Sequence, residues 1–277
     1  MIWKIKDRPL DLTSHAFIMG ILNTTPDSFS DGGKFHDLET ALAHAREMIA
    51  EGATIIDIGG ESTRPGAISV CAAEEISRTI PVIEVLRSEW DGYISIDTQK
   101  AAVAAAALDV GADIVNDVSG LTADPDMPGV CAKAQCGIVI MHMRGTPADM
   151  QDAPVYADVV GEISSFFQER LRALTELGIT ADRICFDPGI GFGKTLDQNL
   201  ALLRSLNSLA PKHRPLLLGV SRKSFISKIS DASSPSDRDS ATIAITAFAR
   251  GKNIMLHRVH NVRGNLAALH MVEAMGK

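Results

Sequence analysis

Hydrophobic and polar positions along the chain form a repeating pattern of short apolar runs and longer amphipathic stretches. The apolar runs have the length and composition of buried strands, and the stretches between them have helical periodicity. We expect strands at 17–22, 54–58, 93–97, 113–117, 137–142, 183–187, 215–220 and 254–259. We expect helices at 38–51, 73–89, 99–110, 126–135, 156–178, 196–210, 223–229 with 238–250, and 262–275.

Eight strand–helix units are the number that closes a parallel α/β barrel. The chain, at 277 residues, is within the size of one such unit, so we expect a single-domain (β/α)8 TIM barrel over residues 1–277. Residues 1–15 precede the pattern and are expected to form a short hairpin or extended segment. A doubly wound open sheet is the alternative. It usually has a glycine-rich loop after the first strand, whereas Gly20 lies inside that strand.

Nearly every predicted strand is followed by a polar or charged side chain. In a parallel barrel the carboxyl ends of all strands meet at one rim, where binding and catalysis take place. A ring of such residues therefore predicts a functional site at that rim. Its members are Asn23, Glu61, Thr63, Arg64, Asp97, Asn116, His142, Asp187, Ser221, Arg222, Lys223, Arg258 and His260.

Three members of the ring are rich in hydrogen-bond acceptors. Asp97, Asn116 and Asp187 follow the third, fourth and sixth strands. Carboxylates and an amide facing one pocket suit a flat heterocycle with several N–H donors. The other interpretation is that the two aspartates are helix N-caps, which aspartate often is.

A second group is cationic or carries hydroxyls, and it suits a phosphate or diphosphate. Arg258 and His260 alternate at the end of one strand, so we expect them to face the same way. The group consists of Thr63, Arg64, Lys223, Arg258 and His260.

The overall charge limits the partners. A net charge of −7 argues against bulk nucleic-acid binding but not against a small anionic substrate. The sequence contains no apolar run long enough for a membrane span, and residues 1–11 lack the apolar core of a signal peptide. We therefore expect a cytoplasmic protein with no membrane partner. The cysteines lack zinc or redox spacing and are expected to be buried, reduced thiols: Cys71, Cys131, Cys136 and Cys185.

Eight short segments, taken in order over nearly the whole chain, resemble the dihydropteroate synthase family. The stretches ESTRPG and RVH favour that family over the related pterin-binding methyltransferases. The segments are LNTTPDSFSDGG (22–33), DIGGESTRPGA (57–67), SIDTQKAAVA (95–104), NDVSG (116–120), MHMRGTPADMQ (141–151), DPGIGFGKT (187–195), GVSRKSFI (219–226) and RVHNV (258–262).

The resemblance implies a transferase that condenses 7,8-dihydropterin-6-ylmethyl diphosphate with 4-aminobenzoate, releasing pyrophosphate and forming 7,8-dihydropteroate. It implies that Asn23 ligates Mg²⁺, and that Lys223, Arg258 and His260 act in catalysis. The implied pterin site is Asp97, Asn116, Asp187 and Lys223. The implied diphosphate site is Thr63, Arg64, Arg258 and His260. The implied 4-aminobenzoate site is Phe29, Pro65, Phe192 and Ser224.

Sulfonamides are expected to compete with 4-aminobenzoate, and a homodimer is expected because the helical faces of barrels often dimerise. A pterin-dependent methyltransferase domain and a non-catalytic pterin-binding protein are the alternatives. The chain departs from the family at Asn261, where aspartate is more common. The Arg-X-His pattern selects Arg258 and His260, and not His257, as the site residues of the last strand.

Overall fold

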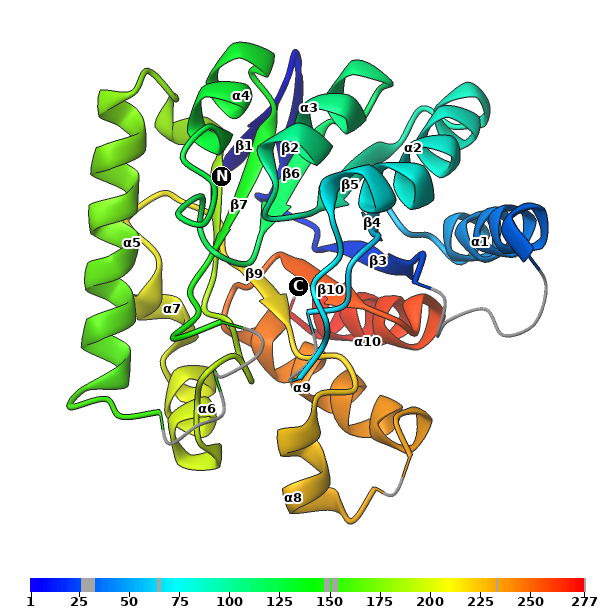
Figure 1. Cartoon of the computed structure of the whole chain (residues 1–277). Helices are drawn as coiled ribbons and strands as arrows, with labels where there is room; N and C mark the ends of the chain where they lie inside the picture. Colours follow the sequence, from blue (N-terminus) through cyan, green and yellow to red (C-terminus); the bar gives the residue numbers. More distant parts are fainter. Residues whose placement is uncertain (26–32, 64–65, 147–149, 151–153, 233, 277) are drawn as a thin grey trace.

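A closed barrel of parallel strands forms the centre of the molecule (Figure 1). The computed structural model describes residues 1–25, 33–63, 66–146, 150, 154–232 and 234–276. The strands are β3 (Phe17–Asn23), β4 (Ile55–Gly59), β5 (Tyr93–Asp97), β6 (Ile114–Asp117), β7 (Gly137–Met141), β8 (Ile184–Asp187), β9 (Leu217–Gly219) and β10 (Leu256–Val259).

The strands pair in the order β8-β7-β6-β5-β4-β3-β10-β9. The main-chain N–H of Phe186 donates to the carbonyl of Pro215 at 3.0 Å, and Phe186 forms a parallel bridge with Leu216. These contacts join the two ends of the sheet and close the ring. The predicted TIM barrel is therefore confirmed.

Helices surround the barrel on its outer face (Figure 1). The predicted helix 196–210 is divided at Ser205, whose φ of −107° lies outside the helical range. Serine competes with the backbone for hydrogen bonds and tolerates such breaks. The helices are α1 (Gly33–Ala50), α2 (Ala72–Glu89), α3 (Ala101–Asp109), α4 (Met127–Ala134), α5 (Val159–Glu176), α6 (Leu196–Arg204), α7 (Leu206–Leu209), α8 (Ser227–Ser230), α9 (Asp239–Gly251) and α10 (Val262–Met275), with short 3₁₀ turns η2 (Ala181–Arg183), η3 (Ser224–Ile226) and η4 (Ser236–Arg238).

An antiparallel hairpin, β1 (Ile2–Ile5) and β2 (Arg8–Asp11), covers the amino-terminal end of the barrel. Trp3 and Ile5 are fully buried. They pack against the first residues of the barrel strands, such as Ile55 of β4 and Leu256 of β10. The Trp3 Nε1–H donates to the carbonyl of Arg183 at 2.8 Å. The predicted hairpin is confirmed, and it leaves the carboxyl-terminal end of the barrel for the site.

The prediction of buried thiols holds for three of the four cysteines. Cys71 is exposed, because it is the residue immediately before α2 in a loop at the rim. Among the residues that the structure describes, no helix is long and apolar enough to cross a membrane.

Candidate active site

The acceptor-rich residues lie at the carboxyl-terminal ends of β5, β6 and β8, on one rim of the barrel. Asn116 and Asp187 are each 5% exposed, and the Asp97 side chain is 10% exposed. The N-cap interpretation of the two aspartates is wrong. Thr195 caps α6, Lys100 precedes α3, and Asp187 instead accepts the N–H of Gly189 at 2.7 Å. The carboxylates therefore belong to the pocket and not to helix ends.

Arg258 lies between two carboxylates. Its Nε donates to Oδ2 of Asp57 at 2.5 Å, and its Nη2 donates to Oδ2 of Asp97 at 2.6 Å. Asp57, fully buried in β4, also accepts the Asn116 amide N–H at 3.0 Å. The sequence prediction missed Asp57. Its signal was a carboxylate inside an otherwise apolar strand.

Burial shifts the pKa values of three ionisable groups in the site. Burial and repulsion from other carboxylates raise the pKa of Asp97 to about 7, although Arg258 opposes the shift. Burial also raises the pKa of Asp187, against the attraction of Lys223. Burial lowers the pKa of Lys223 to about 8, although Asp187 opposes that change. Proton exchange at this site therefore falls in the physiological range.

Lys223 lies against the loop that follows β8. Its Nζ donates to the carbonyl of Ile190 and sits 4.4 Å from the centre of the Phe192 ring. Ser224 follows at the start of η3 and is exposed. The structure thus brings Phe192 and Ser224, two predicted 4-aminobenzoate residues, beside the predicted pterin residue Lys223.

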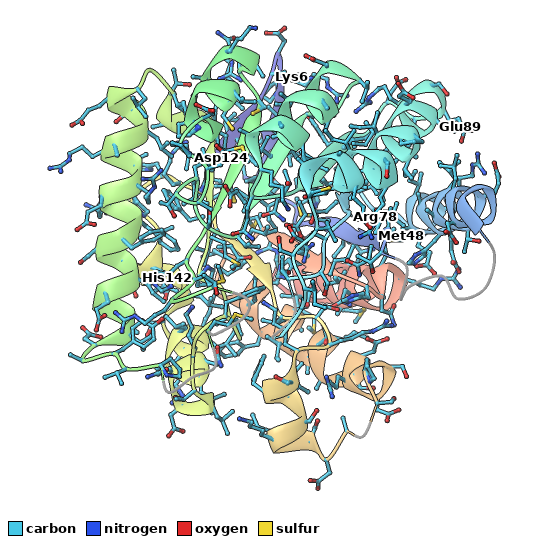
Figure 2. The ribbon with its side chains drawn as sticks, viewed as in Figure 1. Lys6, Met48, Arg78, Glu89, Asp124 and His142 are labelled. Atoms are coloured by element: carbon cyan, nitrogen blue, oxygen red, sulfur yellow. The ribbon has the colours of Figure 1, made fainter. Side chains whose placement is uncertain are left out.

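A buried lysine holds the same loop in place. The Lys194 Nζ donates to the carbonyls of Gly189 and Phe192 at 2.9 and 2.8 Å and lies 3.2 Å from Nδ1 of His142. Burial, aided by the charge of Lys194, lowers the pKa of His142 to about 3. The ring of His142, labelled in Figure 2, packs edge-on against the ring of Phe166 in α5. Lys194 and His142 therefore hold the loop after β8, which carries Phe192, in place.

His260 is oriented by Ser221, which lies two residues after β9. The Ser221 hydroxyl accepts the main-chain N–H of His260 at 3.1 Å and lies 2.9 Å from its Nδ1. His257 instead is buried, with Nε2 beside the carbonyl of Ile254 at 3.1 Å. Arg258, not His257, therefore reaches the interior of the barrel.

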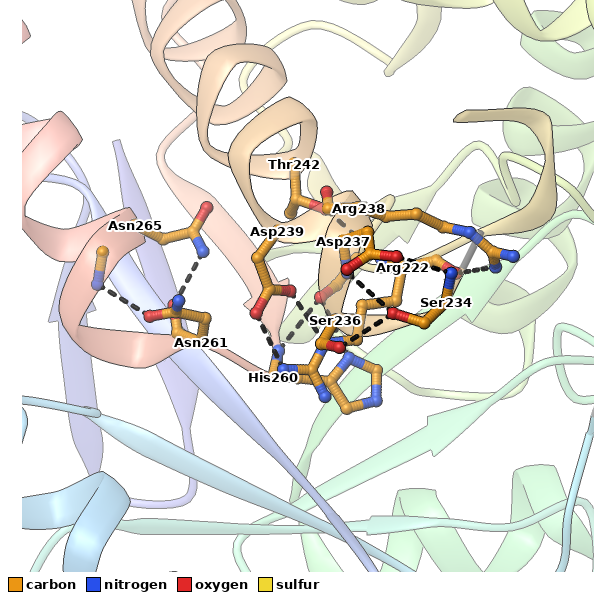
Figure 3. A network of polar contacts seen from close by, with 12 residues as sticks. Arg222, Ser234, Ser236, Asp237, Arg238, Asp239, Thr242, His260, Asn261 and Asn265 are labelled. Atoms are coloured by element: carbon orange, nitrogen blue, oxygen red, sulfur yellow. Dashed lines mark hydrogen bonds and ion pairs between the residues drawn. The ribbon is translucent and has the colours of Figure 1, made fainter. Parts of the chain in front are cut away.

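A polar network anchors the segment after β9 (Figure 3). Arg222 donates from Nε and Nη2 to the two oxygens of Asp239 at 2.7 and 2.8 Å. The Asn261 side chain accepts the N–H of Gly264 at 2.9 Å and so caps α10. Since asparagine and aspartate cap helices equally well, this departure from the family pattern preserves the local structure.

The remaining predicted residues lie at the ends of β3 and β4. Asn23 is half-buried, and its amide makes no hydrogen bond to the described residues. Thr63 is half-buried in the loop after β4, in which Glu61 accepts a hydrogen bond from the ammonium of Lys100. Three predicted residues lie outside the described residues: Phe29, Arg64 and Pro65. The part of the chain that the structure describes contains no cluster of three His, Cys, Asp or Glu residues able to hold a metal.

Comparison with known proteins identifies the family and agrees with the fold. Residues 19–260 match the family described as pterin binding enzyme. A dihydropteroate synthase of Synechocystis is 48% identical over 96% of this chain and 92% of its own length. The crystal structure of the Yersinia pestis dihydropteroate synthase with a sulfonamide drug complex is 41% identical, with a TM-score of 0.93 over 100% of this chain and 99% of that one. The Xanthomonas albilineans dihydropteroate synthase with 4-aminobenzoic acid is 40% identical, with a TM-score of 0.92 over 99% and 98%.

The chain therefore belongs to the family of pterin-binding enzymes. Its relatives over nearly the full length are dihydropteroate synthases, and the chain is a transferase of that kind, which acts in folate biosynthesis.

Proposed function

We propose that the rim pocket condenses 7,8-dihydropterin-6-ylmethyl diphosphate with 4-aminobenzoate and releases pyrophosphate. The observation that carries this proposal is the position of Arg258, whose guanidinium lies in the acceptor-rich pocket beside Asp97. One pocket thus offers acceptors for a heterocycle together with a fixed cation for an anionic group. The solved relatives with a sulfonamide and with 4-aminobenzoic acid support the same choice of ligands.

The pterin is proposed to lie on Asp97, Asn116 and Asp187, with Lys223 at its edge. The carboxylates accept ring and amino N–H groups, and burial strengthens these hydrogen bonds. Gly219 keeps space open at this point, because a Cβ there would lie 3.3 Å from Oδ2 of Asp187. A side chain at position 219 would crowd the carboxylate of Asp187, which is proposed to accept hydrogen bonds from the pterin.

The diphosphate is proposed to lie near Arg258 and His260, with Thr63 and Arg64 contributing from the loop after β4. Nε and Nη2 of Arg258 each donate to a carboxylate, and Nη1 has no hydrogen bond to the residues that the structure describes. The Nη1 side of the guanidinium is thus left for the leaving group. Its charge stabilises the pyrophosphate as the C–O bond breaks.

The second substrate, 4-aminobenzoate, is proposed to bind beside Phe192 and Ser224, together with Phe29 and Pro65. Its amine is neutral near pH 7 and attacks the methylene carbon as the C–O bond to the diphosphate breaks, while the dihydropterin shares the positive charge that develops there. The nitrogen then loses a proton to water or to the released pyrophosphate. No side chain is then needed as a covalent nucleophile. We propose that sulfonamides compete at this position, as the drug complex of the Yersinia pestis relative suggests.

Magnesium is proposed to be held by Asn23 and the substrate diphosphate. One amide oxygen that is free of hydrogen bonds to described residues fits an ion that keeps several waters and takes most of its other ligands from phosphates. A site of three protein carboxylates would instead hold the ion without the diphosphate, and it would have contradicted the proposed role of Asn23. When bound, the ion would supply positive charge to the diphosphate.

We propose that the protein is a cytoplasmic homodimer. Helices α6 and α9 form a surface pocket of about 290 Å³ lined by Leu200, Leu203, Arg204, Ala244, Ile245 and Phe248. Phe248 is 49% exposed, so part of the apolar lining of this pocket is open to solvent. Covering it with a second copy would remove that surface from water. Light scattering of the protein and of Phe248→Glu tests this, since a monomeric unaltered protein would contradict it.

The function is tested by a pyrophosphate-release assay with both substrates, with and without Mg²⁺, with a sulfonamide titrated in. We expect release only when both substrates are present, stimulation by Mg²⁺, and competition by the sulfonamide against 4-aminobenzoate. Absence of release under every condition would contradict the proposal and indicate pterin binding without turnover.

A further inference from the structure

Asp57 lies in the middle of β4 and contacts two residues of the site. A single oxygen, Oδ2, accepts from Nε of Arg258 at 2.5 Å and from Nδ2 of Asn116 at 3.0 Å. The other oxygen, Oδ1, has no hydrogen-bond partner among the described residues. The carboxylate thus joins β4 to side chains from β10 and β6.

Stability does not account for a carboxylate at this position. The neighbouring β4 residues Ile55, Ile56 and Ile58 are fully buried and apolar. Burying a charge is costly, and replacing a buried ion pair by apolar side chains is often neutral or stabilising. Half of the carboxylate is also left without a hydrogen bond. Residues that break the local pattern in this way are typical of functional sites.

We propose that Asp57 is a positioning residue, which fixes the orientation of Arg258 and Asn116 for the ligands. Asp57 holds Nε and Asp97 holds Nη2, so these two hydrogen bonds fix the orientation of the guanidinium. The Nη1 side then remains available to the ligand. With its Nδ2 held by Asp57, the Asn116 amide presents Oδ1 as an acceptor. The inference rests on the proposed function, because it names what orients two of its contacts.

The charge of Asp57 also acts on Asp97. Burial is the largest cause of the raised pKa of Asp97, and Arg258 opposes it. Repulsion from three carboxylates adds to the effect of burial, from Asp57, Glu75 and Asp117, and the ammonium of Lys223 also lies near. Removing the charge of Asp57 therefore lowers the pKa of Asp97. A buried aspartate whose charge does not act on Asp97, such as Asp113, would not have this effect.

The test is Asp57→Asn, which keeps the shape and removes the charge. We expect kcat/KM for the dihydropterin diphosphate to fall about 10- to 100-fold, the effect of losing a hydrogen bond to a charged group. The KM for 4-aminobenzoate should change less than about threefold. The acidic limb of the pH profile should move below its value in the unaltered protein. Asp57→Ser, which keeps an acceptor, serves if Asp57→Asn does not fold.

A double-mutant cycle with Arg258→Met separates positioning from independent action. If Asp57 acts through Arg258, adding Asp57→Asn to Arg258→Met should lower kcat/KM by a clearly smaller factor than Asp57→Asn does alone, the remaining loss reflecting the contact of Asp57 with Asn116. Fully additive losses would overturn the inference.

Asp113 provides a matched control. It is a buried aspartate, 5% exposed, that pairs with Arg87 at 2.5 Å before β6 begins, at the amino-terminal end of the barrel. Asp113→Asn should lower the melting temperature and leave the pH profile unchanged. An unshifted acidic limb in Asp57→Asn, as in this control, would reduce Asp57 to a structural role.

Binding separates the inference from the proposed function. If the unaltered protein releases no pyrophosphate, the proposed reaction fails. Calorimetric titration with 6-hydroxymethyl-7,8-dihydropterin across the same pH range then tests Asp57 directly. Weaker binding by Asp57→Asn with a shifted pH dependence supports the inference, and identical binding to the unaltered protein overturns it.

Discussion

Replacing Arg258 by methionine keeps much of the side-chain volume and removes the cation between Asp57 and Asp97. Both carboxylates are enclosed by the barrel, with side chains 0% and 10% exposed. Breaking a buried pair by removing one partner costs about 3–5 kcal/mol. At about 2 °C per kcal/mol for a chain of this size, the melting temperature should fall by roughly 6–10 °C.

The loss of stability in Arg258→Met should be larger at high pH than at low pH. The pKa of Asp97 is about 7 with Arg258 present, and Arg258 lowers it, so in Arg258→Met the pKa lies higher still. A carboxyl whose pKa is raised by folding contributes stability at low pH, and that contribution is lost as the pH rises through the folded pKa. The variant should therefore lose more stability at about pH 8.5 than at about pH 6.

Turnover should also fall, because the guanidinium no longer stabilises the departing pyrophosphate. Loss of a catalytic electrostatic donor costs about 2–4 kcal/mol, or roughly 30- to 1,000-fold in kcat/KM. Calorimetric melting at both pH values and the pyrophosphate-release assay measure the two effects. Arg263→Met is the control, because Arg263 is 81% exposed in its pair with Glu51 and should change stability by less than about 1 kcal/mol. Unchanged turnover, or a melting loss equal at both pH values, would refute the reasoning.

Three further predictions follow from other ionised or capping groups. The kcat/KM for the pterin substrate should be bell-shaped in pH, with limbs near the pKa values of Asp97 (about 7) and Lys223 (about 8); a flat profile between pH 6 and pH 9 would contradict this. Burial would raise the pKa of Glu273, but hydrogen bonds from His15 and Arg250 lower it to about 2, so its stabilisation is lost as the pH falls from 4.5 to about 2. In Glu273→Gln, the free energy of unfolding should therefore change less with pH between 4.5 and about 2, and it should be lower than in the unaltered protein at pH 7. Asn261→Ala should cost about 1 kcal/mol in denaturant unfolding and Asn261→Asp almost nothing, whereas equal losses would exclude the capping role.

The barrel could be predicted from the sequence because most strands are largely apolar runs, and a polar residue lies at or soon after nearly every strand end. The predicted strand at 93–97 matches β5 over its full length. Such runs reflect burial on both faces, which every strand of a parallel barrel shares. The break at Ser205 could not be predicted in this way, because the residues on both sides have helical periodicity.

The site was predicted less completely, for a physical reason. Strand-end positions such as Asp187 can be read from the sequence, but Asp57 lies two residues inside its strand. Its importance depends on the parallel register and on the reach of Arg258 across the barrel. The alternation of side chains along a strand predicted that Arg258 and His260 lie on the same face of that strand. Their actual partners, Asp57 in β4 and Ser221 in the segment after β9, are far away in the sequence and could not be inferred from one strand alone.

The hairpin at the base of the barrel gives the protein a built-in optical reporter. The chain has two tryptophans, Trp3 and Trp90. Trp3 is fully enclosed, and its indole N–H is bonded to a carbonyl 180 residues away, whereas Trp90 is only half-buried where α2 ends. The emission of Trp3 should therefore lie at shorter wavelength than that of Trp90. A shift of the emission to longer wavelength before the helical circular dichroism changes would report that the hairpin leaves the barrel first.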